Sequence, residues 1–392
     1  MITDAWVPSP LGALINKFHA SLSGRFHPDL DKACVRAFTM RRVVFDLWLR
    51  FRGISGWAAM NVRDQWFQQN VVRELCRLEQ GQLTKLVFSY SYSAKTPFQW
   101  ARDRGIPTVL CQIDPGPEEQ RWVCEQVAKE QDSAADLGCG PPLAYWERWR
   151  REIELADCIL VNSEWSKKLL ERGGVPAEKT KIVPLAYERS ADQRVMPTRR
   201  YPDRFVVERP LKVLFLGQVI LRKGVIPLLK AAVRLEGSPV EFLMAGPDPE
   251  GLLYSHAVGG NVRKLGAVDR ILAEQLYSDA DVFILPTYSD GFAITQLEAA
   301  AHRLPLIVSR YCGEVVEEGR NGWVLPEVNA NCIVDVLEKC LGDPSRLEAF
   351  SAYELDWERF SLETLGKNLQ EAEEQARRFA QGSADLQKSA SA

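Results

Sequence analysis

Short apolar runs alternate with longer amphipathic stretches along most of the chain. In the first half, β-branched runs are separated by helical patterns such as that at 146–155; the runs lie at 85–90, 107–111, 158–161 and 181–184. A second series begins at Lys212 and includes apolar runs at 282–286 and 304–309. Runs that are apolar throughout are typical of strands covered on both faces of a parallel sheet. The pattern therefore predicts an α/β protein with one doubly wound sheet in each half.

Polar segments mark the expected domain boundaries. Residues 189–210 are polar and interrupted by prolines, and they are predicted to form a linker. We therefore expect an N-terminal domain at 1–205, which includes this linker, and a C-terminal domain at 206–355. A charged helix is expected at 356–380, followed by a disordered tail at 381–392. Two domains also agree with a length of 392 residues, which is more than one typical core accommodates.

Composition and charge argue against a nucleic-acid-binding, membrane-spanning or disulfide-rich protein. The chain carries 49 basic and 52 acidic residues and a net charge of −3, so no overall attraction to nucleic acid is expected. It has no apolar run of about 18 residues, and its first residues lack the layout of a signal peptide, so we expect a cytoplasmic protein. Nine cysteines occur without a Cys-x-x-Cys pair and are predicted to be reduced thiols.

Asp290 and Glu298 are the strongest candidate site residues. They lie between the apolar runs at 282–286 and 304–309, so their segment is predicted to form the helix of a βαβ unit. We expect this helix to begin at Gly291 and to direct its unpaired N–H groups toward the crevice at the strand ends, where anions bind. Eight residues of helix rise roughly 12 Å, about the reach from a ribose across a diphosphate to a sugar. The pair therefore predicts a nucleotide-sugar site; the alternative is two solvated helix carboxylates.

Segment 288–302 resembles the acidic motif of the retaining GT-B glycosyltransferases of family 4, the group 1 glycosyl transferases. Other segments are similar to successive blocks of that family, in the same order: 156–166, 175–184, 211–224, 241–246, 265–268, 277–286 and 317–325. The resemblance implies a GT-B fold, in which two Rossmann-like doubly wound domains face a cleft. It also implies that the N-terminal domain binds the acceptor, the C-terminal domain binds the nucleotide sugar, and a C-terminal helix returns to the N-terminal domain.

The resemblance also assigns roles to residues of the C-terminal domain. It implies that Glu298 hydrogen-bonds the ribose hydroxyls and that Asp290 contacts hydroxyls of the donor sugar. Lys223, with Arg222 beside it, stands where the family places a cation against the diphosphate, and such cations stabilise the charge on the leaving group. Further donor contacts are expected from Gly217, Gln218, Val268, Gly291, Phe292, Ala293 and Ile294.

Three positions depart from the family pattern. The family usually has Glu where this chain has Asp290, and commonly Arg where it has Gln218. Arg222 lies in the same loop as Gln218 and is a candidate substitute. The family often has a His where this chain has residues 112–116, yet segment 111–119 is still expected to face substrate because it follows a strand's carboxyl end. None of the four histidines has a spacing typical of a metal site or a triad.

Two further segments allow more than one interpretation. Asp279 and Asp281 match the Asp-x-Asp pattern of metal-dependent glycosyltransferases, but they lead into a buried run, so we expect a structural role and no metal. Residues 36–52 mix aromatic and basic side chains. We favour a helix that packs on the N-terminal domain with its arginines in water; the alternative is peripheral contact with an anionic membrane.

Together these features predict a hexosyltransferase-type glycosyltransferase (EC 2.4) with no cofactor. The donor is expected to be a UDP or GDP sugar in preference to an ADP sugar, and the acceptor a carbohydrate, a lipid-linked sugar or a small molecule. Retention of configuration is implied by the resemblance, and metal-independent chemistry is expected. The function would serve polysaccharide or glycoconjugate biosynthesis in the cytoplasm, with peripheral attachment to the inner face of the membrane as an alternative. A catalytically degenerate GT-B paralogue that acts as a binding or scaffolding subunit is the alternative function.

Overall fold

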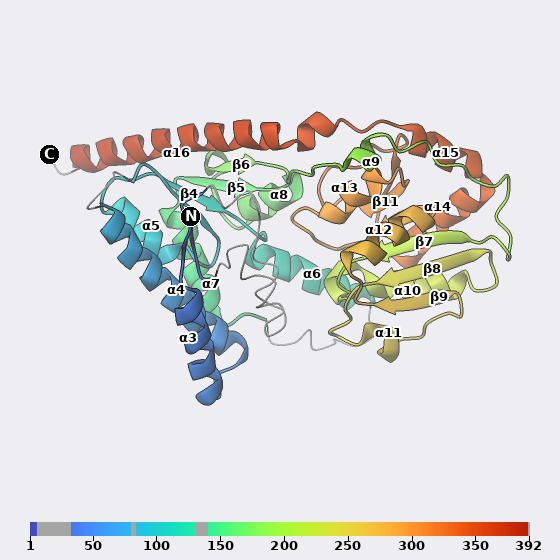
Figure 1. Cartoon of the computed structure of the whole chain (residues 1–392), viewed down its shortest axis with the longest axis horizontal. Helices are drawn as coiled ribbons and strands as arrows, with labels where there is room; N and C mark the ends of the chain where they lie inside the picture. The colour runs from blue at the N-terminus through green and yellow to red at the C-terminus, as the bar shows by residue number, and fades with distance from the viewer. Residues whose placement is uncertain (6–32, 80–83, 131–139, 391–392) are drawn as a thin grey trace. The chain divides into compact units, whose positions relative to one another are not determined.

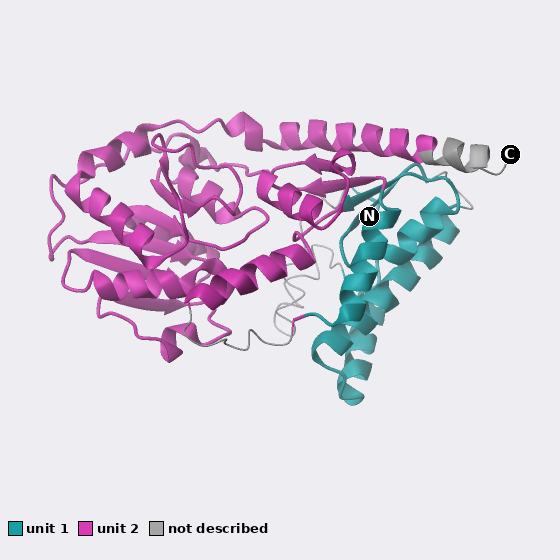
Figure 2. Ribbon diagram, turned by 180° about the vertical axis from the view of Figure 1, so that it is seen from behind, with its two compact units in different colours: residues 1–110, 141–156, 383–392 teal, residues 111–140, 157–382 magenta. Residues whose placement is uncertain are grey.

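The computed structural model describes residues 1–5, 33–79, 84–130 and 140–390 (Figure 1). The described chain is a mixed α/β protein with parallel sheets, as the alternation of patterns predicted. It divides into two compact units: unit 1 contains 1–110, 141–156 and 383–392, and unit 2 contains 111–140 and 157–382 (Figure 2). This division does not coincide with the expected domain boundary near residue 205, which stays a prediction.

A six-stranded parallel sheet forms the core of unit 2 (Figure 1). Its central strands are β7 (Leu211–Leu216) and β10 (Val282–Leu285). The strand order is β9-β8-β7-β10-β11-β12, with β8 (Val240–Ala245), β9 (Val262–Gly266), β11 (Leu306–Ser309) and β12 (Gly322–Leu325). The chain therefore runs outward from β7 in one direction and then outward from β10 in the other. Such a reversal is the topological switch point at which doubly wound sheets bind ligands.

The apolar runs form these strands because both faces of the sheet are covered by helices. All four residues of β10 and of β11 are buried, and Phe215, Phe242 and Phe283 are 0% exposed. Helix α10 (Val225–Arg234) buries Val225, Leu228 and Leu229, at the spacing of one helix face. The other helices of this region are α11 (Leu252–Ser255), α12 (Arg270–Asp279), α13 (Ile294–Ala301), α14 (Ala330–Gly342) and α15 (Pro344–Ala352).

Unit 2 also contains a second group of elements. Strands β5 (Cys158–Val161) and β6 (Thr180–Ile182) pair in parallel, and helices α6 (Pro117–Glu130) and α8 (Glu164–Arg172) accompany them. The charged C-terminal pattern forms a 3-10 turn, η4 (Trp357–Phe360), and then helix α16 (Leu362–Ala390). Helix α16 therefore continues into the segment from 381 that was expected to be disordered. Its Glu371 pairs with Lys181 of β6 at 2.6 Å.

The expected linker lies against the rest of unit 2. It contains a short helix, α9 (Ala191–Arg194), which begins with a capping box at Ser190. Further along, the Arg199 guanidinium donates to the carbonyl oxygens of Ser278, at 2.6 Å, and His302, at 3.0 Å. An arginine that satisfies carbonyls at the ends of two helices is held firmly. This segment is thus anchored to the six-stranded sheet.

Unit 1 is built mainly of helices. It contains α3 (Thr39–Phe51), α4 (Gly56–Glu79), β3 (Val87–Tyr90), α5 (Lys95–Arg102), β4 (Thr108–Cys111), whose last residue belongs to unit 2, and α7 (Leu143–Leu155); a short pair, β1 (Ile2–Thr3) and β2 (Arg36–Ala37), completes it. Glu152 of α7 is 1% exposed and accepts the N–H groups of Tyr92 at 2.6 Å, Ala94 at 2.9 Å and Lys95 at 3.1 Å. Burial raises the pKa of Glu152 to about 7, although these hydrogen bonds oppose the shift. A single buried carboxyl group thus closes the turn between β3 and α5.

The cysteines of the described residues are all free thiols. Burial raises the pKa of Cys111 to about 11 and that of Cys158 to about 12. A thiol with such a pKa is almost entirely protonated at neutral pH and therefore unreactive. The expected reduced state agrees with this environment.

Candidate functional site

The predicted cation and the first predicted carboxylate meet at the switch point of unit 2. Lys223 ends the 3-10 turn η3 (Leu221–Lys223), which follows β7, and Asp290 lies in the loop after β10. The Lys223 ammonium forms an ion pair with the Asp290 carboxylate, and the two side chains are 14% and 16% exposed. Because β7 and β10 are neighbours in the sheet, residues distant in sequence reach the same point. The structure thus brings together two residues that the sequence singled out separately.

The backbone around this pair is fixed by a close approach of the two loops. Gly224 has φ +68°, and a Cβ atom built there would lie 1.8 Å from the carbonyl oxygen of Pro286. The carbonyl oxygen of Arg222 accepts the Tyr288 N–H at 2.9 Å and the Thr287 hydroxyl at 3.0 Å. Only glycine fits at position 224, because any side chain would push the loops apart. The position of Lys223 relative to Asp290 is therefore set by the backbone.

The helix that carries Glu298 begins later than the sequence predicted. Helix α13 starts at Ile294 with Ala293 as its N-cap, not at Gly291. Asp290 lies in the loop before it, where its N–H donates to the carbonyl oxygen of Tyr311 at 2.7 Å. The expected continuous helical rise between the two acids is therefore wrong, because half of the intervening segment is loop.

Glu298 is held by a buried tyrosine. The Tyr277 hydroxyl donates to a carboxylate oxygen of Glu298 at 2.7 Å. Burial, and then the charge of Glu298, raise the pKa of Tyr277, so the phenol stays protonated and remains a donor. The Tyr277 ring stacks on His302, whose Nδ1 lies 2.9 Å from the Glu298 carbonyl oxygen. The His302 ring thus packs against Tyr277, and Tyr277, which the sequence did not single out, orients Glu298.

Arg222 is directed by a buried acid that sequence reasoning missed. Its guanidinium donates to the carbonyl oxygen of Ser289 at 3.2 Å and lies 3.5 Å from a carboxylate oxygen of Glu119. Glu119 is 7% exposed, and burial raises its pKa, while Arg222 and the Ser289 hydroxyl act in the opposite direction. The signal available was its place at the end of segment 111–119, the loop expected to face substrate. The structure thus places one acid of that segment beside the basic loop.

Three aromatic side chains support the loop after β10. Trp122, Trp165 and Tyr311 lie with ring centroids 4.6 to 5.3 Å apart. The Trp122 indole N–H donates to the Tyr288 carbonyl oxygen at 2.9 Å, and that of Trp165 donates to the Ser289 hydroxyl at 2.8 Å. Indoles that are both packed against other rings and hydrogen-bonded hold the backbone that they contact. Local sequence patterns did not predict this cluster, because its members come from three separate segments.

The backbone amides expected to meet the donor are not equivalent. The Ala293 N–H donates to the Cys312 carbonyl oxygen at 3.1 Å, and the donor contact expected of Ala293 stays a prediction. Gly291, Phe292 and Ile294 show no such acceptor within the part of the chain that the structure describes. Phe292 is buried and its ring lies 6.0 Å from that of Phe360. The free N–H groups therefore flank Asp290 and open the first turn of α13.

The remaining residues predicted to contact the donor are Gly217, Gln218 and Val268. Gly217 follows β7 directly, and its N–H donates to the Ala245 carbonyl oxygen at 2.9 Å. Gln218 is the next residue and is exposed. Val268 follows β9, the edge strand, and is partly buried against the core. Gly217 and Gln218 share the Lys223 loop, whereas Val268 belongs to a strand two places away.

In the Asp-x-Asp pattern, Asp281 forms a salt bridge with Arg209. The Asp281 carboxylate accepts both terminal nitrogens of Arg209, each at 2.7 Å, and the Lys212 N–H at 2.9 Å. Asp281 is 3% exposed, whereas Asp279 ends α12 at the surface. Across 1–5, 33–79, 84–130 and 140–390, no group of three or more His, Cys, Asp and Glu side chains is arranged to hold a metal. The structural role expected for Asp281 agrees with these contacts.

The strand order and the charged pair at its reversal define a Rossmann-like ligand-binding domain. Residues 210–343 match the family described as Glycosyl transferases group 1. The chain is 24% identical over 287 residues to alpha-D-kanosaminyltransferase of Streptomyces kanamyceticus, which covers 70% of this chain and 72% of that one. It is 24% identical over 194 residues, 44% of either chain, to the amylovoran biosynthesis glycosyltransferase AmsK of Erwinia amylovora.

A solved structure shares the fold over most of the chain. Anabaena HepE, solved in complex with UDP and glucose, superposes with a TM-score of 0.58 at 16% identity, covering 94% of this chain and 98% of that one. The chain therefore has the GT-B fold, and its match to the group 1 glycosyl transferases over residues 210–343, with its similarity to named glycosyltransferases, supports an enzyme of the hexosyltransferase class (EC 2.4). None of the helices in the described part of the chain is both long and apolar enough to span a bilayer.

Proposed function

We propose that the chain transfers a hexose from a UDP or GDP sugar to an acceptor, with retention of anomeric configuration and without a metal. The observation that carries this proposal is the meeting of Lys223, Arg222 and Asp290 at the switch point of a doubly wound sheet. A cation fixed at this edge, beside free N–H groups at a helix start, suits a diphosphate. The complex of HepE with UDP and glucose supports a nucleotide-sugar donor.

Each charged residue has a proposed task. Lys223 and Arg222 neutralise the diphosphate as it leaves, and Asp290 contacts hydroxyls of the transferred sugar. In the structure Asp290 orients Lys223 and Glu119 orients Arg222, so the cations are in place before the donor arrives. Preorganised charges of this kind are not reoriented during the reaction and therefore lower its barrier. Glu298, oriented by Tyr277, accepts hydrogen bonds from the ribose.

The proposed chemistry needs no protein nucleophile. The bond from the anomeric carbon to the diphosphate breaks through an oxocarbenium-like transition state, and the acceptor oxygen bonds to the same face of the sugar. Catalysis then consists of positioning and charge stabilisation. We expect turnover to persist in EDTA, because Asp281 is engaged by Arg209. Loss of turnover on chelation that Mn²⁺ restores would contradict this.

The proposal also covers the acceptor and the cellular setting. A carbohydrate, a lipid-linked sugar or a small-molecule acceptor is proposed, in polysaccharide or glycoconjugate biosynthesis within the cytoplasm. The names of the kanosaminyl and amylovoran relatives support this range. The division into an acceptor domain at 1–205 and a donor domain at 206–355 belongs to the same proposal.

A thermal-shift panel of UDP, GDP and ADP and their sugars tests the function. A ligand at about 100 times its Kd stabilises the native state by about 2.7 kcal/mol, which corresponds to an increase in Tm of roughly 5 °C or more. We expect this increase for one UDP or GDP sugar, followed by detectable hydrolysis or transfer of its sugar. Binding without any turnover would instead favour a scaffolding paralogue, and no shift with any nucleotide would contradict both.

A further inference from the structure

Helix α3 presents an apolar stripe on the outside of unit 1. Met40, Val44, Leu47, Trp48 and Phe51 recur at helical spacing and therefore share one face. Their exposed fractions range from 44% for Trp48 to 88% for Phe51. The helix packs on unit 1 through other residues, chiefly Leu49, which is 1% exposed. An exposed apolar stripe on a helix in which Leu49 is the one buried residue is a candidate interaction surface.

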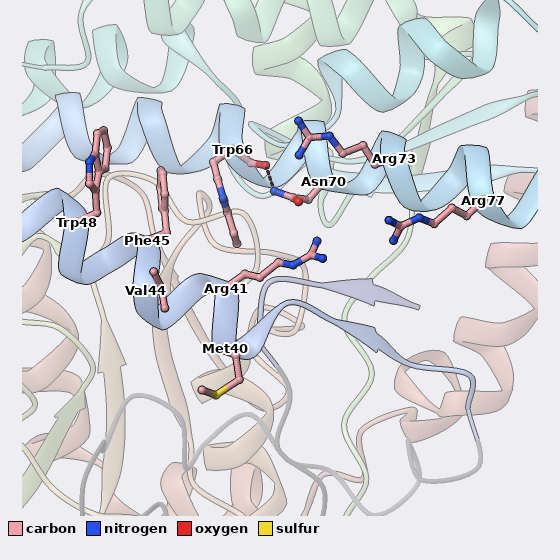
Figure 3. A pocket seen from close by; sticks show the side chains of 9 residues that line it. All are labelled: Met40, Arg41, Val44, Phe45, Trp48, Trp66, Asn70, Arg73 and Arg77. Carbon is pink, nitrogen blue, oxygen red and sulfur yellow. Dashed lines mark hydrogen bonds between the residues drawn. The ribbon is translucent and has the colours of Figure 1, made fainter.

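The stripe borders a pocket between α3 and α4. This pocket has a volume of about 700 Å³, and Figure 3 shows the side chains that line it. Three of them are stacked aromatic rings: the Phe45 ring lies 4.9 Å from that of Trp66 and 5.7 Å from that of Trp48. The polar side chain among them, Asn70, is satisfied by the Trp66 carbonyl oxygen at 2.7 Å. The floor of the pocket therefore consists mainly of packed aromatic rings.

Arginines line the same pocket. Arg41 of α3 and Arg73 and Arg77 of α4 project around it in Figure 3. Arg77 is paired with Glu74 at 3.2 Å, whereas Arg41 and Arg73 have no acidic partner within the described ranges of the chain. Residues 36–52 contain five arginines and a single aspartate, Asp46, which is already engaged by Arg42 and Arg63. The surface is thus apolar and positively charged at once.

We propose that this face of α3 and α4 docks on a bilayer that contains anionic phospholipid. The apolar stripe enters the headgroup region, and the arginines bind lipid phosphates. The arginines favour a phospholipid surface over a peptide. An apolar groove alone would bind a peptide, whereas guanidinium groups with no acidic partner form bidentate hydrogen bonds with phosphate. An amphipathic helix with aromatic and basic residues on its exposed side is typical of interfacial binding. Docking does not depend on the donor site of unit 2, so it stands or fails apart from the proposed function.

Vesicle sedimentation with the full chain tests the docking. Vesicles of phosphatidylcholine alone are compared with vesicles that also contain phosphatidylglycerol. We expect the wild-type chain to sediment only with the second, and to be released when salt rises from about 0.1 M to about 1 M, since the screening length falls from about 10 Å to about 3 Å. The double variant Arg41→Glu with Arg73→Glu should lower partitioning by at least about tenfold, because each basic residue near the surface contributes about fivefold.

An apolar variant and matched controls complete the test. Met40→Ser with Phe51→Ser, at residues 76% and 88% exposed, should weaken partitioning about tenfold without loss of fold. The controls are Val207→Ser with Ile271→Ser, at residues 75% and 72% exposed, and Arg172→Glu with Arg204→Glu; both should bind as the wild type does. Equal binding by patch and control variants, or by both kinds of vesicle, would overturn the proposal. A dimer that the patch variants dissociate, with no vesicle binding, would overturn it in favour of contact between two copies.

Discussion

Two pairs of basic residues, Lys223 with Arg222 in unit 2 and Arg41 with Arg73 in unit 1, stand in opposite electrostatic settings. Lys223 and Arg222 have side chains 14% and 35% exposed, and each faces a carboxylate that fixes its position. Arg41 and Arg73 are exposed and have no acidic partner among the described residues. A partnered, half-buried cation is preorganised for one ligand geometry, whereas unpaired surface cations act through summed charge and tolerate many geometries. The contrast indicates a defined ligand site in unit 2 and a surface contact in unit 1.

Lys223→Met should produce the largest change. Removal of a preorganised cation that faces a leaving group costs about 100- to 1,000-fold in kcat. It also leaves Asp290 without its ion-pair partner, so stability falls as well. The double variant Lys223→Met with Asp290→Asn separates the two effects: we expect recovered stability in urea unfolding but no recovered turnover. A double variant with wild-type turnover would show that the pair is only structural.

The buried carboxyl group of Glu152 should make the free energy of unfolding depend on pH. Glu152 of unit 1 accepts hydrogen bonds from three backbone N–H groups, and burial raises its pKa to about 7, above the ordinary value of 4.5. Its protonated form is therefore favoured by folding, so its contribution is fully present below pH about 4.5 and is lost as pH rises through about 7. The free energy of unfolding of the wild type, relative to Glu152→Gln, should fall on the order of 3 kcal/mol over this range. Urea unfolding of both proteins across the range measures it; a constant or rising difference would contradict the shift.

Substitutions of Glu298 and Asp290 should affect different steps, donor binding for the first and turnover for the second. Glu298→Gln is expected to weaken both the free nucleoside diphosphate and the sugar nucleotide, whereas Asp290→Asn should spare the diphosphate and mainly reduce turnover. A hydrogen bond to a charged group contributes about 1.5 to 3 kcal/mol, or roughly ten- to a hundredfold. Titration of each variant with diphosphate and with intact donor measures the difference. Asp290→Glu, which restores the longer acid, should alter turnover or donor preference; equal, negligible effects of all three changes would favour a scaffolding paralogue.

Glu119→Gln should have the smallest effect, about tenfold in kcat/KM, because Arg222 keeps its bond to the Ser289 carbonyl oxygen. Burial raises the pKa of Glu119, so in the wild type its pairing with Arg222 is lost as pH falls through that raised value. The glutamine variant should lack this acidic limb of the rate profile. A merely structural role would lower kcat/KM without changing the shape of the pH profile.

The sheet of unit 2 was predictable because its strands are apolar throughout. The runs at 282–286 and 304–309 became β10 (Val282–Leu285) and β11 (Leu306–Ser309), since strands buried on both faces have no polar positions. The start of α13 was not predictable from local sequence. The N–H groups of Asp290 and Ala293 are held by carbonyl oxygens of Tyr311 and Cys312, which lie beyond the next strand. Tertiary hydrogen bonds thus keep these residues in a loop.

The candidate site shows the same division. Lys223 and Asp290 were found separately through motifs, but their ion pair required the adjacency of β7 and β10. Glu119 and Tyr277 were missed because their partners, Arg222 and Glu298, lie far away in sequence or on another helix. Local patterns predict which residues carry charge, whereas the groups that orient them are known only from the fold.

A crystal structure of the full chain with bound UDP or GDP tests the proposed donor site. We expect the diphosphate at the carboxyl ends of β7 and β10, within hydrogen-bond distance of the Lys223 ammonium and the Arg222 guanidinium. The ribose should lie against the carboxylate of Glu298. A diphosphate bound elsewhere in the chain, with the Lys223–Asp290 pair undisturbed and remote from it, would show that this pair is not the donor site.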